Sequence, residues 1–218
     1  MAQVKRIHDN VTAEPFYLEL RTRRMFRRIV GAIAWPHGET PGSVLVLGEI
    51  RSRAAFLNTR HDLHILYERQ SDDVQSLIEL ASRAQDEWHV FMWHTPLVDQ
   101  RIYLLDDYND SRRIARQMPM TISDPLGWSG KGEGLLPVYF AMVQRRTLNE
   151  KTLFFGPESA AAVEIQRLDP DEMNAKPTDY PSAAALFWSV AAVDMIPIPE
   201  WGERLPSFGG PADPIGGY

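Results

Sequence analysis

The chain contains no cysteine among its 218 residues. This absence excludes disulfide frameworks, cysteine-ligated zinc or iron–sulfur sites, and cysteine nucleophiles. The chain also lacks an apolar run of the roughly 18 residues that a membrane span needs. Its first ten residues, MAQVKRIHDN, lack the apolar stretch of a secretory signal. We therefore expect a cytoplasmic protein with no membrane partner.

Positive charge is scarce overall but concentrated near the start of the chain. The formal net charge is -6, which argues against a general nucleic-acid coat. Residues 1–28 nevertheless hold seven basic and three acidic groups (a net +4), whereas residues 169–218 hold two basic and eight acidic groups (a net -6). Either the two ends match each other, or the first forms a basic face for phosphate or an acidic partner. The candidates for such a face are Arg21, Arg23, Arg24, Arg27 and Arg28.

The order of apolar segments predicts an α/β domain with a mixed sheet. Three strand-like runs at 26–35, 43–50 and 61–69 follow one another over short connections, which is typical of an antiparallel meander. A helical pattern from 74 to about 87 and a short apolar run at 89–93 then indicate a right-handed crossover onto the same sheet.

The remainder of the chain predicts further helices and an extended end. Residues 136–148 fit either a helix or a strand, and residues 183–196 are apolar nearly all round, as in a buried helix. We expect an irregular arm over 1–25, one α/β domain over 26–196 and a Pro/Gly-rich C-terminal tail over 197–218. Phe208 and Tyr218 are candidate anchors through which this tail binds a partner.

Two polar stretches are poor matches to known kinds of site. His61 and His64 would point to opposite faces of a strand, so they make a poor chelate and we predict no metal there. The glycine-rich stretch 127–134 has Gly132 after Lys131, where a phosphate-binding loop needs Ser or Thr. We interpret this stretch as a connector, and a ligand-covering lid stays the alternative.

A pair of divalent metal ions is the remaining chemical possibility. Such a site holds two ions about 4 Å apart with carboxylates from neighbouring strand ends and a helix terminus. Glu49, Asp62 and Glu68 lie near predicted strand ends, and Asp179 lies at the start of the last helix. Solvated surface carboxylates are the alternative for all of these residues.

Three stretches of the sequence resemble a known fold. The run RRIVGAIAWP followed by GSVLVLGEIR is similar to the first hairpin of the nuclease domain in phage terminase large subunits, and TDYPSAAALFWSVAAV is similar to its closing helix. The resemblance covers roughly residues 24–195. It implies a ribonuclease H-like fold, in which carboxylates on the first strand, the fourth strand and the closing helix hold catalytic metal ions.

Only one of those carboxylates has a counterpart here. Asp179 matches the acid of the closing helix, but the first strand carries Ala32, Ala34 and Trp35, and the fourth reads HVFMWH. The resemblance therefore implies a non-catalytic binding or assembly module, phage-type and in the host cytoplasm, that contacts protein or nucleic acid without a cofactor. The alternatives are an Mg²⁺- or Mn²⁺-dependent nuclease that uses Asp179 with Glu49 or Asp62, and a small structural protein of unrelated α/β fold.

Overall fold

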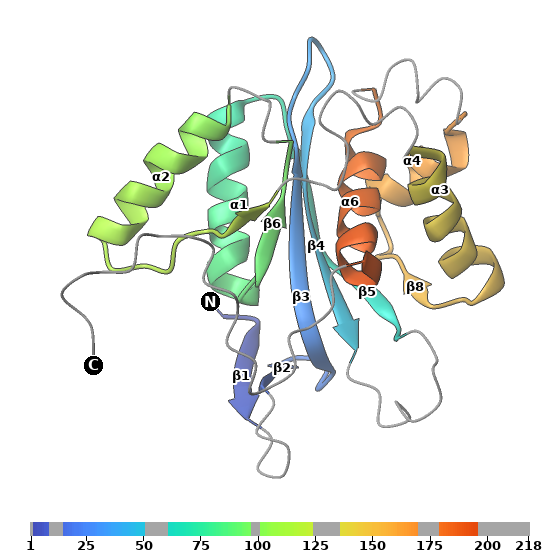
Figure 1. Cartoon of the computed structure of the whole chain (residues 1–218), viewed down its shortest axis with the longest axis horizontal. Helices are drawn as coiled ribbons and strands as arrows, with labels where there is room; N and C mark the ends of the chain where they lie inside the picture. Colours follow the sequence, from blue (N-terminus) through green and yellow to red (C-terminus); the bar gives the residue numbers. More distant parts are fainter. Residues whose placement is uncertain are drawn as a thin grey trace.

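The structure, a computed structural model, describes residues 2–8, 15–50, 61–96, 101–123, 136–169 and 179–195 (Figure 1). The tail beyond residue 196, with Phe208 and Tyr218, and the glycine-rich stretch 127–134 lie outside the described residues. The strands are β1 (Val4–His8), β2 (Pro15–Glu19), β3 (Met25–Ala34), β4 (Gly42–Ile50), β5 (Leu63–Ser71), β6 (Met92–His94), β7 (Ile122–Ser123) and β8 (Leu153–Phe154). The helices are α1 (Val74–Trp88), α2 (Ile102–Ile114), α3 (Leu136–Gln144), which continues into a π-helical turn at Arg145–Asn149, α4 (Ala160–Arg167) and α6 (Pro181–Met195).

The described strands form one mixed sheet, which confirms the predicted α/β class. β3, β4 and β5 make the antiparallel meander, and β6 returns after α1 to pair in parallel with β3. β7 continues the sheet in parallel beyond β6, and β8 adds a parallel strand beyond β5. Through its centre the sheet therefore runs β8-β5-β4-β3-β6-β7.

The predicted irregular arm at the start of the chain is instead a β-hairpin. β1 pairs antiparallel with β2 from Val4↔Glu19 to His8↔Pro15, and β2 pairs with the first residues of β3. Val4 is buried, but most of β1 is exposed or half-buried, so its sequence carries little apolar alternation. The hairpin depends on pairing with β3, which a local pattern does not reveal.

Helices cover both faces of the sheet and give it two cores (Figure 1). Leu45 and Leu47 of β4 belong to the core that contains α6, α3 and α4, whereas Val44 and Val46 belong to the core that contains α1. Because β4 is covered on both faces, it is apolar at nearly every position. α6 lies between the sheet and the outer helices, and this placement confirms the prediction that it is buried. Within the described residues, no helix combines the length and the apolar character needed to cross a membrane.

A glycine permits the close approach of β6 to β3. A Cβ atom at Gly31 would collide with the indole ring of Trp93, which is fully buried. The indole N–H of Trp93 donates to the Oε1 atom of Gln85 on α1 at 2.7 Å. Gly31 thus allows a large aromatic residue to join β3, β6 and α1.

Candidate functional site

The carboxyl ends of β3 and β6 form the natural ligand-binding position of this sheet. These two parallel neighbours leave the sheet in opposite directions, β3 toward β4 and β6 through α2 toward β7. Ligands of open α/β sheets bind at such switch points. Here Ala32 pairs with His94 in the parallel ladder, and Ala34 ends β3. No carboxylate occupies these three positions.

The side chain at the end of β6 is a buried, neutral imidazole. His94 is 2% exposed, and burial lowers its pKa to about 4, with repulsion from the Arg28 guanidinium adding to the effect. Among the described residues, its Nε2 atom and the Oγ1 atom of Thr95 have no hydrogen-bond partner. One imidazole is a poor substitute for the several oxygen ligands that Mg²⁺ requires.

Glu49, Asp62 and Asp179 do not come together in the structure. Asp179 precedes the N-terminus of α6, whereas Glu49 lies near its C-terminus. Arg28 joins Glu49 to that end, because its Nε donates to the Glu49 carboxylate at 3.2 Å and its Nη2 donates to the Val193 carbonyl at 2.7 Å. The 15 residues of α6 span roughly 22 Å at 1.5 Å per residue.

Asp62 comes directly before β5, and its carbonyl accepts from the Ile50 N–H at the end of β4 at 2.8 Å. The backbone of Asp62 therefore lies near that of Glu49 and Ile50, whereas Asp179 precedes the far end of the helix. In the described part of the chain, no group of three or more histidine or acidic side chains is placed to hold a metal ion.

Two further carboxylates meet at the N-terminal end of α6, and the sequence pattern did not identify them as a pair. The Glu68 carboxylate accepts from the Ala161 N–H of α4 at 2.7 Å, and the Glu164 carboxylate accepts from the Ala183 N–H of α6 at 2.8 Å. Burial raises the pKa of Glu164 to about 7, and the nearby Glu68 acts in the same direction. Both groups cap helices, a role set by contacts between residues far apart in sequence.

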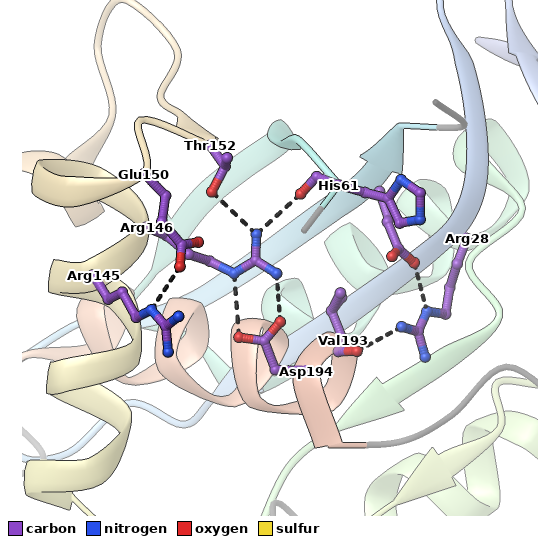
Figure 2. Close-up of polar contacts among 9 residues, drawn as sticks. Arg28, His61, Arg145, Arg146, Glu150, Thr152, Val193 and Asp194 are labelled. Atoms are coloured by element: carbon purple, nitrogen blue, oxygen red, sulfur yellow. Dashed lines mark hydrogen bonds and ion pairs between the residues drawn. The ribbon is translucent and has the colours of Figure 1, made fainter. Parts of the chain in front are cut away.

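Buried ion pairs join the C-terminal end of α6 to the sheet and to the turn after α3 (Figure 2). Arg146 pairs with Asp194, and its Nη1 atom also donates to the His61 carbonyl at 3.0 Å and to the Thr152 hydroxyl at 3.3 Å. Arg145 pairs with Glu150 at 2.6 Å on the more exposed side. Because each charged side chain here has an ion-pair partner within the group, the arrangement indicates a structural role.

Arg28 does not belong to the basic face for which it was a candidate. It is 7% exposed and pairs with Glu49 inside the fold, because alternate residues of β3 point toward α6. Arg21, Arg23 and Arg24 are exposed in the turn between β2 and β3, and Arg27 is half-buried. The turn is closed by the Glu19 N–H, which donates to the Arg24 carbonyl at 2.9 Å, and by the Arg23 N–H, which donates to the Glu19 carbonyl at 3.0 Å.

Two of these arginines contact histidines at the start of β5. The Arg24 Nη1 atom lies 3.2 Å from the His64 Nδ1 atom, and the Arg27 Nη1 atom lies 3.3 Å from the His61 Nε2 atom. A guanidinium has no acceptor, so each ring nitrogen accepts. His64 in turn stacks on Phe154 of β8, with ring centroids 4.5 Å apart and planes 7° apart. We call this set the hairpin surface; its members are Arg21, Arg23, Arg24, Arg27, His61, His64 and Phe154.

Comparison of the chain with protein-family models, curated proteins and solved structures gave no match.

Proposed function

We propose that this chain is a non-catalytic module of ribonuclease H-like architecture that binds nucleic acid through the hairpin surface, within a larger assembly of the phage-terminase type. The order of elements supports this architecture: an antiparallel meander of β3, β4 and β5, the crossover helix α1, and β6 returning beside β3. The closing helix α6 covers the face opposite α1 (Figure 1).

The proposal that this module is non-catalytic rests on the residues at the carboxyl ends of β3 and β6. Ala32, Ala34 and His94 stand where this architecture places metal-binding acids, and all three are buried. Two Mg²⁺ ions bound about 4 Å apart need several carboxylates to offset their charge and replace their water ligands. Asp179 alone does not meet that requirement.

The binding part is supported by the exposed arginines between β2 and β3. Arg21, Arg23 and Arg24 lie together in a closed turn, where a phosphate backbone can approach them from solvent. Neutralising phosphates releases counterions, so such binding weakens steeply as salt rises. An acidic protein is the other partner that this charge fits, and the binding measurements below separate the two.

The first prediction concerns binding and cleavage in the same sample. The full chain is mixed with labelled single- and double-stranded DNA in Mg²⁺ and then in Mn²⁺. We expect binding that falls between about 50 and 200 mM salt, and intact DNA throughout. The double variant Arg23→Ala/Arg24→Ala should bind more weakly and lose part of the salt dependence.

Arg113→Ala is the control variant, because Arg113 is also exposed but pairs with Asp110 on α2, away from the hairpin surface. It should bind as the unchanged chain does. Cleavage that disappears in Asp179→Ala would establish the nuclease alternative. Absence of binding to any nucleic acid would refute the binding proposal and favour an acidic protein partner.

A further inference from the structure

Phe154 is an exposed aromatic side chain held in a defined position. It lies on β8 and pairs with His64 in the parallel ladder, next to the pair of Leu153 with Leu63. Leu153 is 6% exposed and belongs to the core, whereas Phe154 is 42% exposed. The backbone pairing and the buried neighbour therefore fix a phenyl ring at the surface.

His64 covers one face of that ring and is itself held in place. Because the stack is close to parallel, His64 covers one face of the ring, which leaves its edges and its other face for the exposed area of Phe154. Burial lowers the pKa of His64, and the charge of Arg24 lowers it further, so the imidazole is neutral at neutral pH. Arg24, His64 and Phe154 thus form a row of one cation and two stacked rings.

Within the proposed nucleic-acid binding, we infer that the hairpin surface recognises single strands, with an unpaired base stacked on the open face of Phe154 and the backbone phosphate held by Arg24. Every base has a flat face that can extend the stack, so this contact tolerates any sequence. In a duplex the faces of the bases are covered by neighbouring bases, so the phenyl ring has no free base face on which to stack.

The charges around the row agree with this assignment. The two acids that act electrostatically on His64 are Asp62 and Glu19. Glu19 is 9% exposed and its carboxylate already accepts a hydrogen bond from the Thr22 hydroxyl. Asp62 is half-buried. Among the described residues, the exposed Arg24 places its Nη1 atom 3.2 Å from the His64 ring.

The experiment measures fluorescence anisotropy of labelled oligothymidylate and oligouridylate of roughly 20 nucleotides, and of a duplex of equal length, with the full chain. We expect the single strands to bind more tightly than the duplex. Phe154→Leu should weaken single-strand binding by about 5- to 150-fold, since a base–aromatic stack is worth about 1–3 kcal/mol. Its duplex affinity and its salt dependence should not change.

The matched control is Phe91→Leu, since Phe91 is 40% exposed but precedes β6, on the other side of β3 and β4 from β8. It should bind as the unchanged chain does. Phe154→Trp keeps a planar ring and should bind single strands at least as tightly as the unchanged chain, which separates lost stacking from a disturbed β8.

The outcomes distinguish the two proposals. If nucleic acid binds through Arg23 and Arg24 but Phe154→Leu binds single strands normally, the stacking inference is wrong and the proposed function stands. Equal affinity for duplex and single strand would likewise refute the stacking inference alone. If none of the three probes binds, both proposals fail together.

Discussion

Glu164 is a carboxylate placed in surroundings that favour its neutral form. It is half-buried between α4 and α6 and accepts from the Ala183 N–H and from the Gln70 side chain at 3.3 Å. These hydrogen bonds favour the ionised form, but desolvation outweighs them and raises the pKa to about 7. Glu68 is the charged group that faces it from β5. The contact that begins α6 is therefore sensitive to pH near neutrality.

The second prediction follows from the sign of that shift. A carboxyl with a raised folded-state pKa contributes stability that is fully present below its ordinary value of 4.5 and is lost as pH rises through about 7. The free energy of unfolding should thus fall by about 3 kcal/mol across that window, at about 1.4 kcal/mol per pKa unit. Glu164→Gln should flatten the profile, as measured by urea unfolding at a series of pH values.

Asp73 provides a control of opposite sign. It is exposed and caps α1 by accepting from the Ser76 N–H at 2.7 Å, and hydrogen bonding to the Ser76 side chain and then to this N–H lowers its pKa. Stability from this cap is present above its ordinary pKa of 3.8 and lost as pH falls, so Asp73→Asn should alter only the acid side of the profile. A Glu164→Gln profile as steep as that of the unchanged chain between about pH 4.5 and pH 7 would contradict the account.

Individual site residues were only partly predictable. A cluster of five arginines in eight residues indicated a basic surface, and three of them are exposed. The sequence did not show that Arg28 is buried, because its partner Glu49 comes from the next strand and its other acceptor, the Val193 carbonyl, from the end of α6. The Glu68–Glu164 pair was missed for the same reason: both carboxylates cap helices that are distant in sequence.

At the scale of elements, the C-terminal end of α6 depends on Arg146. This residue lies in the π-helical turn after α3 and pairs with Asp194, with side-chain exposures of 2% and 8%. It also donates to the strand-end carbonyl of His61 and to Thr152. One guanidinium thus joins α6, β5 and the segment before β8.

The third prediction compares that buried pair with an exposed one. Arg146→Ala should destabilise the fold by about 3–5 kcal/mol, because it leaves the Asp194 carboxylate buried without its main partner. Arg113→Ala breaks an Arg–Asp pair whose side chains are 61% and 68% exposed, and it should cost at most about 1 kcal/mol. Thermal and urea unfolding measure both.

A double variant tests whether the unpaired Asp194 carboxylate causes the loss of stability in Arg146→Ala. Arg146→Met/Asp194→Leu removes both charges together, and it should recover a substantial part of the stability lost in Arg146→Ala. Equal losses in Arg146→Ala and Arg113→Ala would show that the network contributes little to holding α6.

The sequence predicted the helices and strands whose apolar pattern lies within the element itself. The apolar run of β4, the helical face of α1 and the all-apolar α6 each have a clear pattern, and the structure confirms them. β7 and β8 have two residues each, too few for any period. β1 and β2 alternate weakly because they are largely exposed or half-buried, and their strand geometry comes from pairing with β3.

For the whole molecule, the two ends of the sheet have different chemistry. At the carboxyl ends of β3 and β6, Ala32, Ala34, His94 and Thr95 are buried and none of them is a carboxylate. The opposite end carries the exposed arginines, the histidines and Phe154. The sequence predicted the mixed sheet and shows no acidic residue in β3 or β6, but the joining of Arg24, His64 and Phe154 depends on the sheet itself.

The proposed function depends above all on one property: the end of the sheet where a metal-dependent nuclease would act lacks the carboxylates that hold its ions. Titration of Mn²⁺ into the full chain, followed by the electron paramagnetic resonance signal of the free aqueous ion, tests this claim directly. We predict a signal that rises in proportion to added Mn²⁺, with no saturable loss. Retention of about one or two ions per chain, abolished by Asp179→Asn, would contradict it.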